Sequence, residues 1–156
     1  MRTRLKKKDK PGNILESGGT AGAEINIRQR FRGSRILIAD DDPVNREVAK
    51  LLLEDVGLVV DTAEDGNVAV TMVQDRVYTA ILMDMQMPIS NGLEATRQIR
   101  EIPGYQQTPI LAMTANAFTE DRARCFEAGM NDVIIKPFSP EVLFATLLKW
   151  LEHPTG

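Results

Sequence analysis

The chain has 156 residues and a net charge of −3, with 43% hydrophobic and 26% charged residues, which suits one domain with a core plus an extension. Its single cysteine and single histidine exclude an internal disulfide and a zinc site of the usual type. No apolar run approaches the roughly 20 residues of a membrane span, and none follows the basic N-terminus as in a secretory signal, so we expect a cytoplasmic location and no membrane span in this chain.

Residues 1–34 differ in charge from the rest of the chain. They hold nine Lys/Arg and three Asp/Glu, a net charge of +6, whereas residues 35–156 carry a net charge of −9. Their Gly, Pro and Ser content and few large apolar side chains cannot offset the entropy of ordering. We therefore predict a flexible basic linker or tail over 1–34, with a short extended piece at 25–27. Because Phe31 is the only aromatic residue among these basic ones, we expect no specific nucleic-acid binding.

From Ser34 onward, short apolar runs alternate with amphipathic stretches, and we predict one folded domain over 35–153. The apolar runs predict strands at 35–39, 58–61, 79–83, 109–113 and 132–135. The amphipathic stretches predict helices at 42–55, 66–74, 92–102, 119–128 and 139–151. An Asp-Pro and a Ser-Pro pair open the first and last of these helices, because the polar side chain caps free amides and proline suits the first turn. The alternation predicts an α/β fold, an open parallel sheet covered by helices on both faces.

Polar side chains follow the predicted strands, at the point where each apolar run stops. They are Asp40, Asp41 and Asp42 after the first strand, Asp84 after the third, Thr114 after the fourth and Lys136 after the fifth. In open α/β sheets, binding sites form beyond the carboxyl ends of the strands. The sequence therefore predicts that these residues share one site.

Carboxylates from two strand ends repel one another in a crevice, and a divalent cation relieves that repulsion. Mg²⁺ takes hard oxygen ligands and keeps several waters, so one or two carboxylates and a phosphoryl oxygen suit it. We predict Asp41 and Asp84 as direct Mg²⁺ ligands, with Asp40 close by or acting through water. The backbone carbonyl of Gln86 is expected as a further ligand.

A carboxylate beside a bound metal can also attack phosphorus and form an aspartyl phosphate. We predict that Asp84 is this phosphoryl acceptor, that Lys136 neutralises one phosphoryl oxygen, and that Thr114 donates a hydrogen bond to another. The added charge would draw Thr114 and Lys136 inward and move the loops after the fourth and fifth strands. The site would then act as a two-state switch.

Four segments, at residues 36–46, 82–88, 113–117 and 135–138, closely resemble the receiver domains of two-component response regulators. The resemblance runs from about residue 35 to residue 151. It implies a doubly wound, flavodoxin-like (βα)5 three-layer sandwich with the parallel strand order 2-1-3-4-5. It also implies an acidic pair of Asp40 and Asp41, phosphorylation of Asp84 with Mg²⁺, a switch hydroxyl on Thr114, a phosphoryl contact from Lys136 and a cis Lys136–Pro137 bond.

The same segments, with residues 91–95 and 128–130, are most similar to receivers of hybrid sensor histidine kinases. This resemblance implies a phosphohistidine on a histidine kinase core as the phosphoryl donor, a histidine phosphotransfer domain as partner, or both. It favours a piece of a hybrid kinase, tethered through that protein to a membrane-bound sensor, over a stand-alone response regulator. A weak homodimer stays open, and so does kinase activity of a longer parent chain.

Two positions depart from the family pattern. Val133 stands where many receivers carry an aromatic residue that swings inward on activation, so the aromatic part of the switch is in doubt. Asp42 stands where related receivers often have Asn, and helix capping is its expected role.

Two other interpretations remain. Residues 40–44 also resemble the nucleophile motif of haloacid-dehalogenase-like phosphatases, in which Asp40 would be the nucleophile and Asp42 the general acid/base, but that interpretation leaves Asp84 without a role. A receiver that binds partners without being phosphorylated would be expected to have lost acidic or lysine positions, and this chain keeps them.

Overall fold

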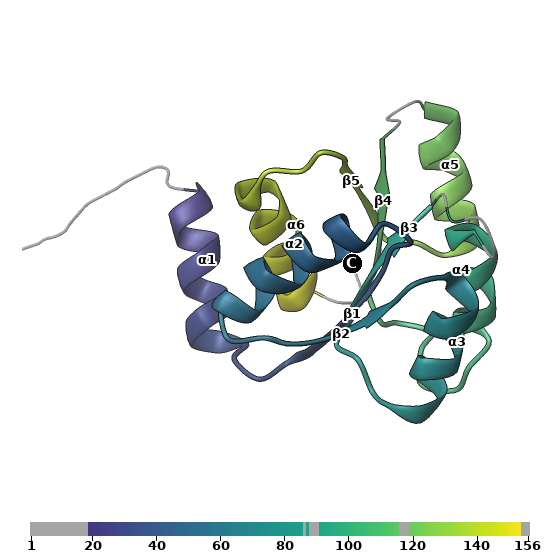
Figure 1. The fold of residues 1–156 in the computed structure, drawn as a ribbon, viewed down its shortest axis with the longest axis horizontal. Coiled ribbons are helices and arrows are strands. Elements are labelled where there is room, and N and C mark those ends of the chain that lie inside the picture. Colours follow the sequence, from purple (N-terminus) through teal and green to yellow (C-terminus); the bar gives the residue numbers. More distant parts are fainter. Residues whose placement is uncertain (1–18, 86, 88–90, 116–118, 154–156) are drawn as a thin grey trace, which may run out of the picture.

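The computed structural model describes residues 19–85, 87, 91–115 and 119–153, which form one sheet with helices on both faces (Figure 1). The strands are β1 (Arg35–Ala39), β2 (Val59–Ala63), β3 (Ala80–Asp84), β4 (Ile110–Thr114) and β5 (Asp132–Ile135). The helices are α1 (Gly19–Arg30), α2 (Pro43–Asp55), α3 (Gly66–Asp75), α4 (Gly92–Arg100), α5 (Thr119–Ala128) and α6 (Pro140–Glu152). All strand pairs are parallel and the order is β2-β1-β3-β4-β5, so the predicted fold class and strand order are confirmed.

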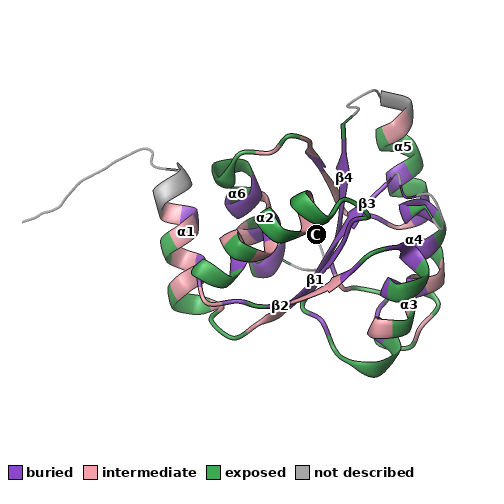
Figure 2. Ribbon diagram, in the orientation of Figure 1, coloured by how far each residue is buried: buried purple, intermediate pink, exposed green. Residues whose placement is uncertain are grey.

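Each face of the sheet has its own hydrophobic core, because successive strand residues point to opposite faces. On β1, Ile36 and Ile38 pack toward α1, α2 and α6, whereas Leu37 and Ala39 pack toward α3, α4 and α5. β3 and β4 are buried along their whole length (Figure 2). None of the described helices is long and apolar enough to cross a bilayer.

Three strands extend one or two residues further toward their carboxyl ends than predicted. Asp84 and Thr114 are therefore the last residues of β3 and β4 rather than the first residues after them. The ladder continues because Asp84 pairs in register with Met113, and the next amide, of Met85, donates to the Met113 carbonyl at 3.0 Å. Polar side chains did not end these strands, because the backbone still had partners.

The caps of α2 and α6 are those that the sequence predicts. The Asp42 side chain accepts a hydrogen bond from the amide of Val44 at 2.9 Å, and the Ser139 hydroxyl accepts one from Val142 at 3.1 Å. Each cap satisfies one of the free amides of a helical first turn. Capping as the role of Asp42 is confirmed.

The N-terminal segment departs from the prediction, because residues 19–30 form helix α1 instead of a flexible stretch with an extended piece at 25–27. Ile27 is fully buried and Ala23 almost so, both in the core with α2 and α6. The prediction was wrong because packing overrides weak intrinsic helix propensity. The spacing of Ala23, Ile27 and Phe31, four residues apart, was the available signal. The flexible assignment of residues 1–18 lies outside the described residues.

Two arginine side chains join the C-terminal end of α1 to the C-terminal ends of α2 and α6. Arg28 donates to the backbone carbonyl of Asp55, the last residue of α2, at 2.8 Å. Arg30 pairs with Glu152, the last residue of α6. These cations also suit the negative end of the α1 dipole.

The amino-terminal edge of the sheet is tied together by one guanidinium. Arg100, at the end of α4, donates to the carbonyls of Tyr105 at 2.6 Å, Thr108 at 2.7 Å and Gly129 at 2.9 Å, and to the side chain of Asn131 at 2.8 Å. Burial lowers the pKa of Arg100. This network joins the segments that lead into β4 and β5 at the edge opposite the predicted site.

Replacing Ile27 by Ala should lower the free energy of unfolding by about 2 kcal/mol or more, because a fully buried side chain leaves a cavity between α1 and α6. Ile25→Ala is the matched control, since Ile25 lies in the same helix but is 51% exposed, and should change stability by less than about 0.5 kcal/mol. Urea unfolding measures both; equal effects would show that α1 is not docked.

Candidate functional site

The carboxyl edge of the sheet brings three carboxylates together at the ends of β1 and β3. Side-chain oxygens of Asp40, Asp41 and Asp84 all lie within 4.8 Å of one another. Asp40 and Asp84 are buried, at 1% and 3% exposure, while Asp41 is exposed. The structure therefore places these predicted site residues in one cluster, with one oxygen donor facing solvent.

Lys136, from the segment after β5, lies between the two buried carboxylates. Its ammonium nitrogen is 3.1 Å from Asp84 Oδ2 and 3.2 Å from Asp40 Oδ2. Burial opposes the charged ammonium, but the Asp84 and Asp40 carboxylates outweigh that effect and raise the pKa of Lys136. The cation thus links β1, β3 and β5 at one point. The Lys136–Pro137 bond is cis, as predicted.

Thr114 is the last residue of β4, which lies between β3 and β5 in the sheet. Its side chain is buried at 3% exposure, and its carbonyl accepts a hydrogen bond from the amide of Lys136 at 2.8 Å. It borders a hollow of about 230 Å³ between α4 and α5. The residues lining this hollow are Met85, Asn91, Leu93, Thr114, Asp121 and Arg124.

Backbone and side-chain contacts that the sequence did not predict hold Asp40 in place. Its Oδ1 accepts a hydrogen bond from the amide of Asp42 at 2.9 Å, and its carbonyl accepts one from the Arg46 guanidinium at 2.8 Å. Asp42 is exposed and is not among the clustered carboxylates. Arg46 lies one helical turn after Asp42, the last residue of the acidic run. This position of a basic residue on α2 was the sequence signal for the contact.

Gly92, the first residue of α4, allows that helix to approach the end of β3. A Cβ atom at this position would lie 2.3 Å from the carbonyl oxygen of Asp84, closer than real Cβ contacts. The Gly92 amide donates to the carbonyl of Met85 at 3.2 Å, and Asn91 caps the helix by accepting from Glu94 at 2.9 Å. A glycine is therefore needed here for α4 to pack this closely on the end of β3.

Two further predictions concern Gln86 and Val133. Gln86, whose carbonyl was predicted as a metal ligand, lies outside the described residues. Val133, at the position where an aromatic switch residue was considered, is half-buried and packs against the core on the α3, α4 and α5 face.

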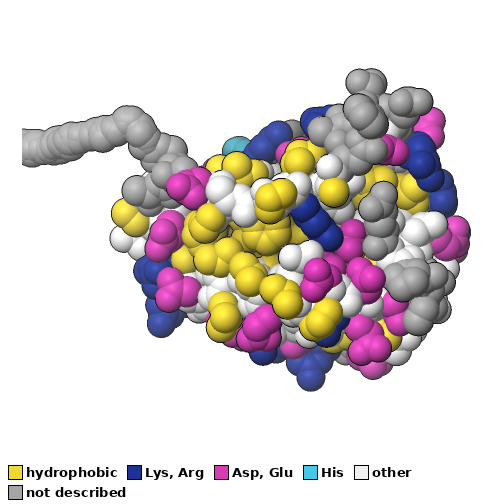
Figure 3. Space-filling model, turned by 45° about the horizontal axis from the view of Figure 1, so that its top comes forward, with side chains coloured by type: hydrophobic (Ala, Val, Ile, Leu, Met, Phe, Trp, Pro, Cys, Tyr) yellow, Lys and Arg dark blue, Asp and Glu magenta, His cyan; other side chains and the backbone are white. Residues whose placement is uncertain are grey.

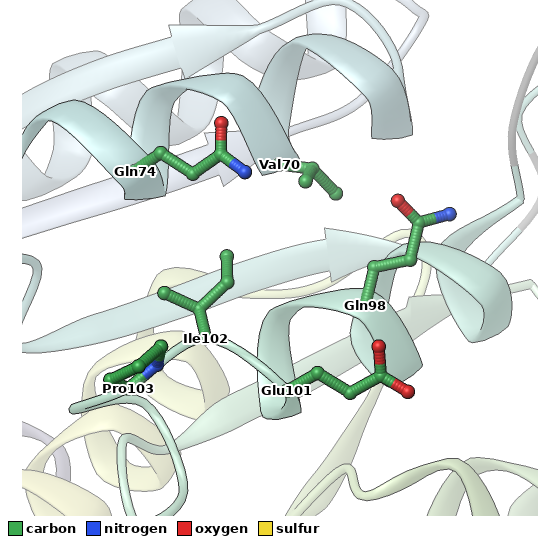
Figure 4. Close-up of a pocket in the computed structure, with 6 residues that line it drawn as sticks. All are labelled: Val70, Gln74, Gln98, Glu101, Ile102 and Pro103. Atoms are coloured by element: carbon green, nitrogen blue, oxygen red, sulfur yellow. The ribbon is translucent and has the colours of Figure 1, made fainter.

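A separate groove lies between α3 and α4 and is not part of the carboxylate cluster (Figure 4). Its volume is about 450 Å³. It is lined by Val70, Gln74, Gln98, Glu101, Ile102 and Pro103. Uncharged side chains make up most of this lining, so it offers none of the paired carboxylates that distinguish the β1 and β3 ends.

A family model described as the response regulator receiver domain matches residues 36–148. Helix α1 precedes the matched region.

Curated proteins show the same likeness. Sensor protein GacS of Pseudomonas syringae pv. syringae is 39% identical over 131 residues, which are 82% of this chain and 14% of that protein. The histidine-protein kinase BarA of Escherichia coli K12 is 36% identical over 115 residues, covering 74% of this chain and 12% of that protein. The chain therefore spans only a small part of these relatives.

Solved structures agree. The receiver domain of sensor histidine kinase PA1611 from Pseudomonas aeruginosa PAO1 has 41% identity and a TM-score of 0.73, and the match covers 77% of this chain and 98% of that one. It was crystallised with a magnesium ion coordinated in its active-site cleft. The chemotaxis protein CheY4 of Vibrio cholerae has 32% identity and a TM-score of 0.74, covering 75% of this chain and 98% of that one.

Gly92→Ala should lower the free energy of unfolding by about 2 kcal/mol or more, because the added methyl group meets the Asp84 backbone. Gly22→Ala is the matched control, since nothing lies within 4 Å of the position that its added methyl group would take, and alanine favours a helix by up to about 1 kcal/mol. Chemical denaturation compares the two; a Gly92 variant as stable as the wild type would contradict the close approach.

Proposed function

The chain belongs to the family of response regulator receiver domains, the phosphoryl-accepting modules of two-component signalling, and from that membership we propose that Asp84 is its phosphoryl acceptor. The observation that carries the proposal is the position of Lys136, whose ammonium lies 3.1 Å from Asp84 and 3.2 Å from Asp40. A buried acceptor carboxylate with a cation beside it is suited to a group that brings additional negative charge. The phosphatase interpretation needs Asp42 as general acid/base beside an Asp40 nucleophile, but Asp42 caps α2 and is not among the clustered carboxylates.

The donor set fits a magnesium ion. Asp40, Asp41 and Asp84 offer hard carboxylate oxygens within 4.8 Å of one another, which is the ligand type that Mg²⁺ prefers. We assign Asp41 and Asp84 as direct ligands and Asp40 as a ligand through water or close by, with the Gln86 carbonyl as a further candidate. When bound, the ion would neutralise negative charge on the transferring phosphoryl group.

Asp84, Lys136 and Asp40 would then each have a separate role in phosphoryl transfer. A carboxylate oxygen of Asp84 forms a bond to phosphorus as the bond from phosphorus to the donor histidine nitrogen breaks, and the electron pair stays on the imidazole. Lys136 releases its Asp84 contact and pairs with a phosphoryl oxygen, while Asp40 stays its counter-charge. This exchange keeps the buried cation compensated before and after transfer.

Thr114 is the proposed switch hydroxyl. It lies at the end of the strand next to Asp84, and its carbonyl is bonded to the Lys136 amide at 2.8 Å. The hollow of about 230 Å³ beside it leaves space for the β4 end to rearrange. A hydrogen bond from the Thr114 hydroxyl to the phosphoryl group would couple phosphorylation to the positions of α4 and α5.

We also propose where the protein donor docks. The exposed side of α2 carries Val44, Val48 and Leu51, which are 68%, 47% and 57% exposed and which we call the α2 stripe. The helix begins directly after the acidic residues, and Figure 3 shows hydrophobic side chains gathered beside carboxylates on this face. An apolar helical surface on a histidine kinase core or histidine phosphotransfer domain would fit here and bring its phosphohistidine to Asp84. By likeness to GacS and BarA, the parent protein is proposed to be a hybrid histidine kinase.

Asp84→Asn should abolish phosphorylation by acetyl phosphate in the presence of Mg²⁺, because the amide cannot act as the nucleophile. Intact-protein mass spectrometry should show one added phosphoryl group on the wild type and none on the variant. Asp42→Asn is the matched control, since Asp42 is an exposed cap outside the carboxylate cluster and should still be labelled.

Chelation of Mg²⁺ and Asp41→Asn should each slow the same labelling strongly. Label that persists on Asp84→Asn, or that maps to Asp40, would refute the assignment.

Leu51→Asp should slow phosphotransfer from a histidine phosphotransfer domain by roughly tenfold or more, because a charge in the α2 stripe costs at least about 1.4 kcal/mol of docking energy. Labelling by acetyl phosphate should be unchanged, since that donor needs no protein contact. Val77→Asp is the control, because Val77 is 84% exposed and lies before β3 at the opposite edge of the sheet. The donor is first chosen from a panel as the domain that transfers fastest to the wild type. Equal phosphotransfer rates for Leu51→Asp and Val77→Asp would refute the α2 stripe as the docking surface.

A further inference from the structure

The peptide groups on both sides of Asp41 are held by side chains. The carbonyl oxygen of Asp40 belongs to the planar peptide group that leads into Asp41, and it accepts a hydrogen bond from the Arg46 guanidinium at 2.8 Å. The amide of Asp42 belongs to the following peptide group, and it donates to Asp40 Oδ1 at 2.9 Å. Because these bonds hold both peptide planes, they restrict the two backbone rotations of Asp41 and so the direction of its side chain.

The Asp41 carboxylate depends on these two bonds more than its neighbour does. Asp40 is buried at 1% exposure, its amide donates to the Ala63 carbonyl at 3.1 Å, and its carboxylate pairs with Lys136. Asp41 is exposed, and within the described part of the chain its carboxylate forms no hydrogen bond or ion pair. Its position in the cluster with Asp84 therefore comes from the backbone of the acidic turn, residues 40–42.

The charge of Arg46 is poorly placed for stability. Arg46 lies in the first turn of α2, where the helix dipole favours anions rather than cations. A guanidinium there also repels the Mg²⁺ ion proposed for this edge of the sheet. Lys136 already compensates the two buried carboxylates, and the Arg46 contact is made to a neutral carbonyl. The placement therefore fits a geometric role better than an electrostatic one.

The residue type suits that geometric role. Long side chains on a helix point toward its N-terminus, so Arg46 reaches back from α2 to the acidic turn that precedes the helix. A guanidinium is planar and pre-organised, so it loses less freedom for each hydrogen bond than an ammonium does. The first turn of α2 and the acidic turn are thereby joined by a side chain as well as by the backbone.

We propose that Arg46 is a positioning residue for Mg²⁺. By holding the Asp40 carbonyl, it directs the Asp41 carboxylate toward Asp84 before the ion arrives. A ligand that is already in place loses less conformational freedom on binding, so the affinity for the ion is higher. The inference rests on the proposed function, since it concerns the same ion.

Mg²⁺ titration of the full chain, followed by backbone amide chemical shifts, tests this role. Arg46→Met should weaken Mg²⁺ binding by roughly tenfold, the usual order for a partner that orients a metal ligand. Lys50→Met is the matched control, because it removes a cation one turn further along α2. Lys50 makes no hydrogen bond or ion pair with residues 40–42, all of which the structure describes. Its loss should leave the affinity unchanged or slightly higher, since one cation fewer repels the ion.

Ionic strength separates positioning from charge. Arg46→Met also removes a repulsion, which partly offsets the lost positioning, and salt screens that repulsion. The deficit in Mg²⁺ affinity relative to the wild type should therefore be larger at high salt than at low salt. Mg²⁺ binding by Arg46→Met that equals or exceeds that of the wild type at high salt overturns the proposal.

Hydrogen exchange of the Asp42 amide gives a second readout, which needs no ion. In the metal-free protein this amide should exchange several-fold faster in Arg46→Met than in the wild type, and at the wild-type rate in Lys50→Met. Unchanged exchange in Arg46→Met shows that the acidic turn is held without Arg46 and overturns the proposal. Arg46→Gln, whose side chain is too short for the contact, should give the same results and serves if the Met variant does not fold.

The wild type separates this inference from the function on which it rests. If Mg²⁺ shifts none of the wild-type amides around Asp84, the proposed metal site is refuted, and the exchange rates still report whether Arg46 holds the acidic turn. If the wild type binds Mg²⁺ and Arg46→Met binds it equally well at high salt, the metal site stands and the role of Arg46 is refuted.

Discussion

A lysine held between two buried carboxylates is the interaction on which the carboxyl edge of this sheet depends. Asp40 and Asp84 are almost fully excluded from solvent, and two such charges so close together would be strongly unfavourable without a cation. Lys136 supplies that cation from a third strand end, at 3.1 to 3.2 Å from each. Removing one member of a buried ionic group typically costs about 3–5 kcal/mol, so each residue fixes the positions of the other two.

The same arrangement is compatible with the switch proposed for this site. Asp84 ends β3, while Asp40 and Lys136 directly follow β1 and β5, so a change in charge at Asp84 would act on the ends of all three strands. The β-sheet below is buried on both faces and does not need to change. The hydrogen bond from the Lys136 amide to the Thr114 carbonyl would couple the loop after β4 to the loop after β5. In the proposed switch, local charge would thus change the positions of the loops and leave the core as it is.

Much of the fold could be predicted from the sequence, because β1 to β5 have apolar runs and α2 and α6 carry clear caps. The gathering of Asp40, Asp41, Asp84 and Lys136 also followed, since parallel strands end at one edge. Helix α1 could not be recognised in the same way. Its glycines and β-branched residues favour no helix by themselves, and burial of Ile27 against α6 is a tertiary effect. The need for glycine at position 92 could not be predicted either. It depends on the distance between α4 and the Asp84 carbonyl oxygen, which only the folded structure shows.

The Arg100 network gives the molecule two mechanically different ends. Its guanidinium fastens the lead-in segments of β4 and β5 to the end of α4 through neutral oxygens, so that edge is cross-braced whatever the charge at the other edge. The amino edge would therefore stay fixed while the carboxyl edge responds to a change in charge. On the switch proposed for Thr114, a small displacement there would move the ends of α4 and α5 at the carboxyl edge more than the ends held by Arg100.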